Sequence, residues 1–270
     1  MNKVTNWSKL SRLIIGLSLF SFLLGGCIQS EPEEKTIIVT SPADSGPGTL
    51  RQALLDAQSG DTISFDAVIF PTTAPATIYV SSELPTISVS NLTIDASNAG
   101  VILDGSNISG DFIMCLHIIS DGNVVRGLQL INFPGTGIGL TRGAQHNLIG
   151  GDRRIGSGPL GQGNLVSRGR TGISLGGNGN SFNTITGNLI GTDASGADDW
   201  GNSGCGIGIE GGASHNTIGP DNIIAYNEPV PQRSSKNENG RHCTIAQSGN
   251  DLSVGDLMRY SQYFLTSVGE

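Results

Sequence analysis

The carboxylates best placed to do chemistry lie together in the glycine-rich segment 191–204, which contains Asp193, Asp198 and Asp199. Carboxylate oxygens are the ligands that Ca²⁺ prefers, and paired carboxylates support the acid–base chemistry of glycoside hydrolysis. The segment matches neither an EF-hand loop nor a GGxGxD calcium repeat, and a solvated acidic turn is the competing interpretation. These three residues are therefore the catalytic candidates, with no cofactor required and calcium as the one metal they could bind.

Trp200 and Arg153 are the candidate contacts for a glycan. Trp200 follows the acidic pair, and its ring suits either stacking on a sugar or covering its own turn. Arg153 lies in a second glycine-rich segment, 150–163, and with Arg142 it could pair with the charges of an acidic polysaccharide. Both segments interrupt the repeats described below, and such loops commonly carry function.

The histidines do not form a cluster in the sequence. His146 and His215 stand in equivalent positions, each directly before an asparagine. A residue that recurs at a repeat position is more typical of a stacking site than of a catalytic base.

The N-terminus has the features of an export signal. Lys3, Lys9 and Arg12 precede an apolar run over 13–24, which is shorter than the roughly 20 residues of a transmembrane helix. The sequence Leu-Gly-Gly-Cys at 24–27 resembles the lipobox of bacterial lipoproteins. This resemblance implies cleavage before Cys27, lipidation of its sulfur, and anchoring at the membrane of the cell envelope on the non-cytoplasmic side. Residues 1–26 are then the signal peptide, and 27–35 are a polar tether.

The composition excludes several classes of protein. The chain has 40 glycines, only 5% aromatic residues and a formal net charge of −8, so a nucleic-acid partner is not expected. The cysteines at 27, 115, 205 and 243 are scattered without zinc spacing. Cys115 and Cys205 lie in apolar runs and are predicted to be small buried hydrophobic residues rather than part of a disulfide framework.

Short β-rich runs punctuated by Gly, Asn, Asp and Ser begin at Thr36 and predict an all-β fold. The runs are 36–40, 61–65, 76–80, 91–95, 101–105, 112–119 and 123–131. One amphipathic helix is predicted over 49–57, because Leu50, Ala53, Leu54 and Ala57 fall on one face. A helix before a ladder of strands is typical of an end cap.

The middle of the chain repeats itself. The elements that begin at Gly137, Gly172 and Gly206 are 35 and 34 residues apart. Each is followed by two Asn-containing strands, which start at Asn147 and Asn164, Asn183 and Asn188, and Asn216 and Asn222. Three strands in each repeat of this length indicate a solenoid.

These repeats resemble the right-handed parallel β-helix, or pectin-lyase-like, superfamily, and in particular the repeats of large bacterial surface proteins. The resemblance covers about residues 36–227, and the opening 37–65 is similar to the N-terminal region of such proteins. In stacked coils, Ile138, Ile173 and Ile207 should form an interior aliphatic stack. Asn147, Asn183 and Asn216 should form an asparagine ladder.

The superfamily includes lyases, hydrolases, adhesins and inert spikes, so the resemblance implies a fold and leaves the activity open. Pectate lyases combine calcium-binding carboxylates with a basic residue, for which Arg126, Arg142, Arg168 and Arg170 are available. Polygalacturonase-type hydrolases carry Asn-Thr-Asp, but the matching places at 183–185 and 216–218 read Asn-Thr-Ile. This difference argues against that hydrolase class.

The repeats stop after Asn227, and residues 228–270 are predicted to be an irregular tail or a cap. Residues 251–268 have the pattern of an amphipathic helix, and a foreign tail produced by truncation or frameshift is the alternative. We expect a lipid-anchored surface protein that binds glycans or matrix or serves as a spacer. The alternative is a polysaccharide lyase or hydrolase that uses segment 191–204.

Overall fold

The structure is a computed structural model that describes residues 34–228 together with the backbone of 242–244, 247–248 and 252–253. The described residues belong to one compact unit, and residues 1–33 lie outside them. The predicted signal peptide, Cys27 and most of the tether therefore lie outside them as well. Within the described part, no helix has the length and apolar character needed to cross a membrane.

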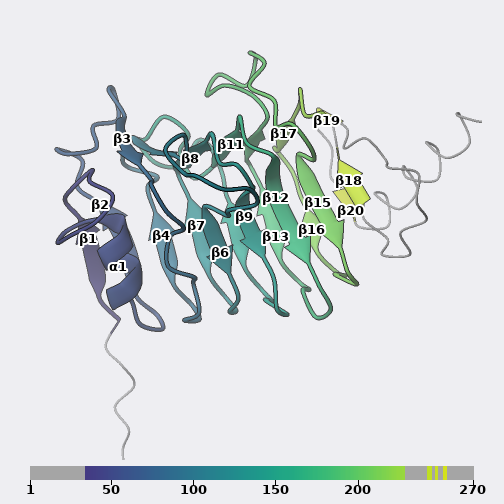
Figure 1. The fold of residues 1–270 in the computed structure, drawn as a ribbon, viewed down its shortest axis with the longest axis horizontal. Helices are drawn as coiled ribbons and strands as arrows, with labels where there is room; N and C mark the ends of the chain where they lie inside the picture. Colours follow the sequence, from purple (N-terminus) through teal and green to yellow (C-terminus); the bar gives the residue numbers. More distant parts are fainter. Residues whose placement is uncertain (1–33, 229–241, 245–246, 249–251, 254–270) are drawn as a thin grey trace, which may run out of the picture. The chain divides into compact units, whose positions relative to one another are not determined.

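The strands form three sheets, here named A, B and C (Figure 1). Sheet A contains β1 (Thr36–Val39), β2 (Thr62–Phe65), β4 (Thr93–Asp95), β7 (Val124–Arg126), β10 (Leu148–Gly150), β13 (Thr184–Thr186), β16 (Thr217–Ile218) and β20 (Leu252–Ser253). Sheet B contains β3 (Ala76–Tyr79), β5 (Val101–Asp104), β8 (Leu128–Ile131), β11 (Leu165–Ser167), β14 (Leu189–Ile190), β17 (Ile223–Ile224) and β19 (Gln247–Ser248). Sheet C contains β6 (Leu116–Ile118), β9 (Thr136–Leu140), β12 (Thr171–Gly176), β15 (Ile207–Glu210) and β18 (His242–Thr244).

From β4 to β17 the chain visits sheets A, B and C in strict rotation, and all strand pairs from β1 to β17 are parallel. Each coil thus places one strand in each sheet, which confirms a mostly β, solenoid-like fold with three strands per repeat. The predicted run 123–131 is two strands in different sheets, since the chain turns at Gly127 with φ +80°. The predicted strand 112–119 is shortened to β6, because residues 112–115 belong to the preceding loop.

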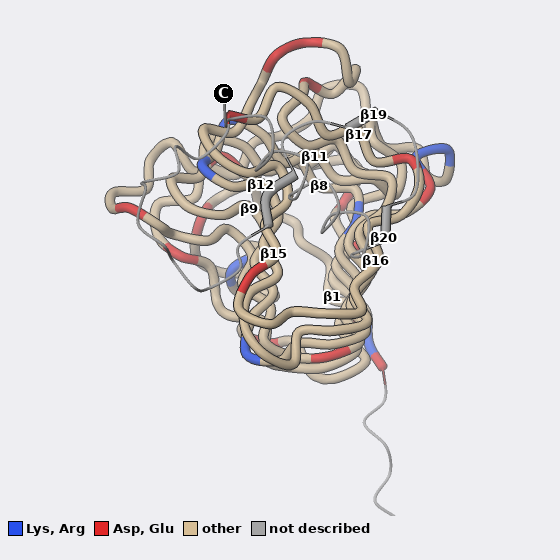
Figure 2. Tube along the Cα trace, turned by 90° about the vertical axis from the view of Figure 1, so that its right-hand side faces the viewer, with Lys and Arg blue, Asp and Glu red and all other residues tan. Residues whose placement is uncertain are grey.

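The interior is filled by aliphatic side chains that stack from coil to coil. Ile173 pairs in register with Ile138 on one side and Ile207 on the other, and the three side chains are buried. Figure 2 looks along the stack and shows the sheets surrounding this common interior, while the charged residues lie around the outside. The predicted aliphatic stack is confirmed.

The predicted asparagine ladder is also present, and it begins one coil earlier, at Asn123. The Oδ1 atom of Asn183 accepts from the backbone N (3.0 Å) and Nδ2 (2.9 Å) of Asn147. The same pair of bonds joins Asn123 to Asn147 and Asn183 to Asn216. A second ladder contains Asn164, Asn188 and Asn222, and a third contains Asn202 and Asn227. These bonds satisfy the buried amides at the corners of the coils.

Helix α1 (Leu50–Asp56) confirms the predicted helix. The Thr49 hydroxyl caps it by accepting from the backbone N of Gln52 at 3.2 Å. Leu50, Ala53 and Leu54 are buried against the core.

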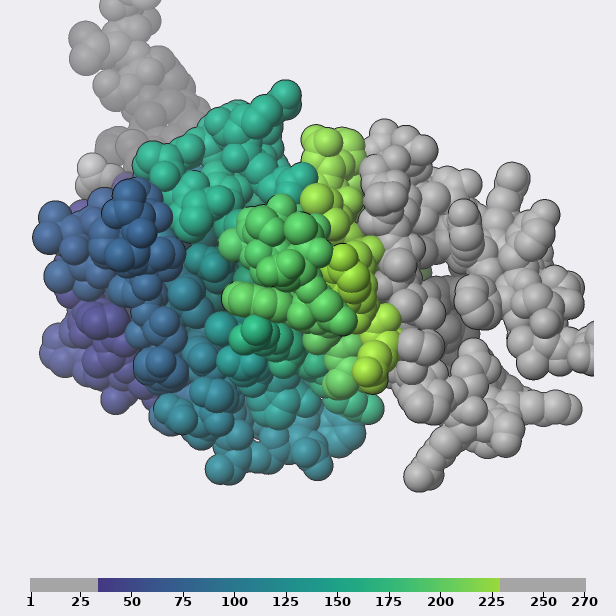
Figure 3. Space-filling view, turned by 90° about the horizontal axis from the view of Figure 1, so that it is seen from above, coloured from purple at the N-terminus to yellow at the C-terminus, as the bar shows by residue number. Residues whose placement is uncertain are grey.

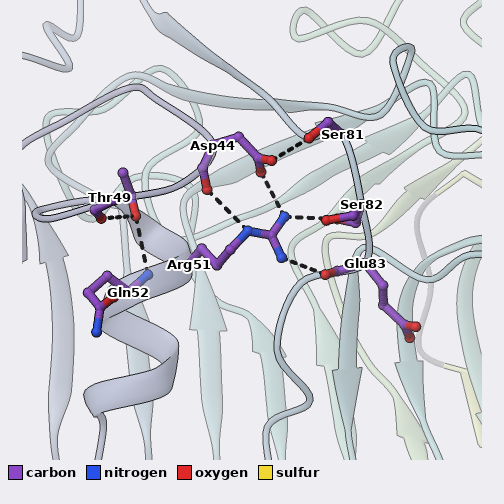
Figure 4. A network of polar contacts seen from close by, with 8 residues as sticks. Asp44, Thr49, Arg51, Gln52, Ser81, Ser82 and Glu83 are labelled. Atoms are coloured by element: carbon purple, nitrogen blue, oxygen red, sulfur yellow. Dashed lines mark hydrogen bonds and ion pairs between the residues drawn. The ribbon is translucent and has the colours of Figure 1, made fainter.

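Arg51, on the other side of α1, fixes the surrounding loops (Figure 4). Its guanidinium forms a 2.7 Å ion pair with Asp44 and donates to the carbonyls of Ser82 and Glu83. The network therefore ties the start of the helix to the loop that follows β3.

The described strands of the tail differ from the predicted helix over 251–268. Leu252 and Ser253 form β20, which pairs antiparallel with β16. Two more antiparallel pairs join β18 to β15 and β19 to β17. The rest of the predicted helix lies outside the described residues.

Candidate functional site

The acidic residues of segment 191–204 do not form a shared site. Asp193 Oδ1 accepts from the backbone N atoms of Ala197 and Asp198, each at 3.0 Å, and from the Ser195 hydroxyl. These hydrogen bonds, led by the one from Asp198, lower the pKa of Asp193 to about 2. Asp199 accepts from the backbone N of Gly201. The carboxylates of Asp193 and Asp199 thus stabilise their own turn. Among the described residues, no salt bridge joins Asp193, Asp198 or Asp199 to Arg or Lys.

Trp200 covers the outer face of sheet B. It is half-buried and packs on a small cluster that contains Leu160, Leu165 and Leu189. The Arg168 guanidinium lies 3.8 Å from the centroid of the Trp200 ring. Both predicted functional loops contribute to this cluster, Leu160 from 150–163 and Trp200 from 191–204. Figure 3 shows the second loop (green) on the outer surface. Of the two roles predicted for Trp200, the packing supports covering the turn.

Arg153 and its neighbours also serve the loop itself. Arg153 is half-buried, and its side chain passes beside Gly163, where an added Cβ would lie 2.7 Å from Arg153 Cγ. Asp152 and Arg154 form an exposed ion pair at 2.8 Å. The hydrogen bonds from Arg154 lower the pKa of Asp152 to about 2. Segment 150–163 therefore does not direct a cluster of charges into a groove.

The histidines at repeat positions form a stack, as predicted. Phe182 lies between them: its ring centroid is 5.2 Å from that of His146 and 5.4 Å from that of His215. All three residues have φ between 56° and 58°, the left-handed conformation of the same corner in successive coils. The arrangement is structural, because each ring faces another ring.

A groove of about 300 Å³ lies on the outer face of sheet C and is the candidate site considered in the described part of the chain. Its volume is at the small end of the range for ligand pockets. The lining residues come from the loop before β6 and from β9, β12 and β15: Phe112, Met114, Gly135, Thr136, Arg170, Thr171, Ser174 and Glu210.

Phe112 and Arg170 form one wall of this groove. The Phe112 ring is 62% exposed, and the Arg170 guanidinium lies over it, 4.2 Å from the ring centroid. Phe112 has φ +68°, a conformation that costs free energy for a bulky residue. Gly135 allows the loop to approach, because a Cβ at this position would lie 2.4 Å from the Ile113 carbonyl oxygen. Strained backbone thus presents an aromatic ring to solvent.

The floor of the groove combines hydroxyl groups with a thioether. The Met114 sulfur lies against Gly139, at 2.5 Å from the position of an added Cβ. Gly139 and Gly208 flank Ser174 in register, so this row has almost no side-chain bulk. Thr136 pairs in register with Thr171, and Glu210 adds a half-buried carboxyl group. The groove therefore offers apolar contact, hydroxyl groups and both signs of charge.

His117 lies on the same sheet and forms a separate polar contact. Its Nε2 atom is 2.7 Å from the Thr141 hydroxyl. Partial burial lowers the pKa of His117, Glu83 raises it and Arg142 lowers it, with a net fall below 6.5. The imidazole is therefore largely neutral at pH 7.

Of the four arginines predicted as possible bases of a lyase, Arg126 forms an ion pair with Asp95 at 2.7 Å.

Cys205 differs from the prediction. It is buried, as expected, but it is disulfide-bonded rather than a free apolar residue. Cys115 is free, and burial raises the pKa of its thiol well above 9.0. The sequence does not predict the disulfide, because the four cysteines are scattered without a pairing pattern.

No family model, curated protein or solved structure matches this chain. The described residues contain no group of three or more His, Cys, Asp or Glu side chains that could hold a metal ion. The groove was not anticipated from the sequence, in which Arg170 is only one of several arginines and Phe112 falls in a predicted strand. The contact between them depends on coils far apart in the chain, and no local pattern signals it.

Proposed function

We propose that this protein is exported, lipid-anchored through Cys27, and binds glycans in the groove on sheet C. Its body is proposed to be a right-handed parallel β-helix of the pectin-lyase-like superfamily, with α1 as the cap of the first coil. The single observation that carries the binding proposal is the exposed Phe112 ring under the Arg170 guanidinium, beside a floor of hydroxyl groups.

The chemistry of the groove suits a sugar. A sugar ring has apolar C–H faces and a polar rim of hydroxyl groups. Phe112 and Met114 offer apolar contact to the faces, while Thr136 offers a hydroxyl group to the rim, and Ser174 and Glu210 line the same groove. Arg170 adds a cation, whose guanidinium lies over the Phe112 ring.

The disulfide of Cys205 supports export. Disulfides persist mainly in oxidising compartments outside the cytoplasm. This agrees with the basic start, the apolar run and the lipobox of the N-terminus.

Binding is tested with purified residues 28–270 on an array of neutral and acidic oligosaccharides, followed by calorimetry on any ligand found. We expect Phe112→Ala and Arg170→Gln each to weaken binding about tenfold, which corresponds to about 1.4 kcal/mol. Tyr79→Ala is the control, because Tyr79 is exposed on sheet B. Unchanged affinity in both groove variants would overturn the site, and turnover of a polysaccharide abolished by Asp198→Ala would favour the lyase or hydrolase alternative.

The anchor is tested separately by fractionation of cells. Cys27→Ser should move the protein out of the membrane fraction, whereas Cys115→Ser should leave it there. Mass spectrometry of Cys27 then identifies the acyl groups. Wild-type protein found only in the soluble fraction would contradict the anchor.

A further inference from the structure

The described strands of the C-terminal segment run antiparallel to the strands of the last coil and visit the three sheets in the opposite order. The solenoid visits the sheets in the order C, A, B through β15, β16 and β17. The later strands visit C, B, A through β18, β19 and β20, and each pairs antiparallel with the last strand of its sheet. One coil-like turn of opposite direction therefore covers all three sheet edges.

These edges need a partner. The outermost strand of a parallel sheet presents unpaired backbone N–H and C=O groups, which can pair with the edge of another molecule. Here Ile207–Ile209 is paired with Thr244–His242, and the other two edges are paired in the same way. Solenoid proteins commonly require such terminal caps to stay soluble.

Cys205 lies where the first of these pairs begins. It is fully buried and disulfide-bonded, and Cys115 is free. The sequence has four cysteines, which leaves Cys27 and Cys243 as partners. The backbone of Cys243 is in register with Gly208, and a Cβ added at Gly208 would lie 4.0 Å from Cys205 Cβ. The register thus places the backbone of Cys243 opposite a residue whose Cβ position is close to Cys205 Cβ, and a disulfide joins Cβ atoms about 3.5–4.5 Å apart.

We propose that Cys205 and Cys243 form this disulfide, and that it fastens strands β18–β20 as a closure over the last coil. The two thiols lose two protons and two electrons, and an oxidising disulfide accepts them and becomes two thiols. The bond closes the loop that joins the solenoid to its last strands, so it limits the chain entropy gained when the closure opens. Reduction would free the closure and expose three sheet edges.

The pairing is tested on the full chain, alkylated without reductant and digested. A cross-linked peptide that contains Cys205 and Cys243 is the expected result. A Cys205–Cys27 cross-link, or alkylation of Cys205 without reductant, would overturn the assignment.

The closure is tested by hydrogen exchange and light scattering. Reduction of the wild type should lower the melting temperature by about 5–10 °C and speed exchange in β15, β16 and β17 by at least about tenfold, while β9 and β12 stay protected. Cys243→Ser should behave like the reduced wild type and should not change further with reductant. Because Cys243 takes no part in the parallel strand pairs from β1 to β17, this variant is expected to keep the solenoid fold. Unchanged exchange in β15–β17 in both cases would overturn the closure.

Discussion

At the scale of single residues, asparagine is well suited to the corners of this solenoid. Its Oδ1 atom accepts two hydrogen bonds from the previous coil, and its Nδ2 atom donates to the next. Asn183 does both, and Nδ2 also donates to the Ala144 carbonyl at 2.9 Å. Leucine would fill the space, but the backbone N and Nδ2 of Asn147 and the Ala144 carbonyl would lose these hydrogen bonds.

Asn183→Leu is therefore expected to lower the free energy of unfolding by about 3 kcal/mol or more, because an unsatisfied buried polar group costs about 1–3 kcal/mol. Thermal and urea unfolding measure this loss. The exposed Asn178 is the matched control, and Asn178→Leu should change stability by less than about 0.5 kcal/mol. Equal effects of the two substitutions would contradict the importance of the ladder.

Two hydrogen-bonded carboxylates, the buried Asp61 and the half-buried Asp95, make the fold sensitive to acid. Burial raises the pKa of Asp61, but hydrogen bonds from the backbone N of Gln58 and Lys35 lower it, and the result lies below 3.8. Asp95 also has a lowered pKa: burial raises it, and Arg126 and Ser97 lower it. Stability from such groups is fully present above the unfolded pKa and is lost as the pH falls through the folded pKa.

The melting temperature should thus fall as the pH drops below about 4 and change little from these groups between about pH 5 and 7. Asp61→Asn should lower stability at pH 7 and reduce the further loss on acidification. The exposed Asp111→Asn variant should keep the wild-type profile. If the melting temperatures of Asp61→Asn and the wild type fell by the same amount between pH 7 and about 2.5, Asp61 would not contribute to the acid sensitivity.

At the scale of elements, the two long loops serve as covers of sheet B. Leu165 and Leu189 point out of this sheet, and Leu160 and Trp200 return to cover them. The sequence predicts the positions of the loops because they interrupt the repeat. It does not predict their role, because Leu165 and Leu189 look like core residues in a strand pattern and nothing local shows which face they occupy.

Two glycines allow the destabilisation caused by a steric clash to be measured apart from the destabilisation caused by backbone strain. Gly127 has φ +80°, and a Cβ there would lie 2.3 Å from the carbonyl carbon of Ala96. Gly177 has φ +97°, but nothing lies within 4 Å of its added Cβ. Gly127→Ala should therefore destabilise by about 1–3 kcal/mol more than Gly177→Ala. Chemical denaturation of the two variants measures this difference, and equal losses would show that backbone strain alone is responsible.

At the scale of the whole solenoid, the stabilising contacts connect each coil with its neighbours along the solenoid axis. Each coil packs on its two neighbours, so the repeats predict the stacks of Ile138, Ile173 and Ile207 and of the ladder asparagines. The sequence does not predict the aromatic stack in full, because Phe182 differs in type from His146 and His215. The groove is also missed, since Phe112 and Arg170 are brought together only when separate coils stack.

This arrangement predicts graded hydrogen exchange. Amides of β9–β14 should exchange more slowly than those of β16 and β17, because the central coils are paired on both sides with coils of the solenoid. Mass spectrometry on peptides resolves these segments. Uniform protection from β4 to β17 would instead show that the solenoid opens as one cooperative unit.

The contact between Trp200 and Arg168 has a spectroscopic consequence. The sequence has two tryptophans, Trp7 and Trp200, so a chain cleaved before Cys27, as proposed above, would contain a single indole. The fluorescence emission of Trp200 depends on its surroundings: the ring is half-buried, and the Arg168 guanidinium lies 3.8 Å from the ring centroid. Intrinsic fluorescence therefore follows the opening of segment 191–204 over sheet B, and a spectral change can precede the loss of circular dichroism from the strands.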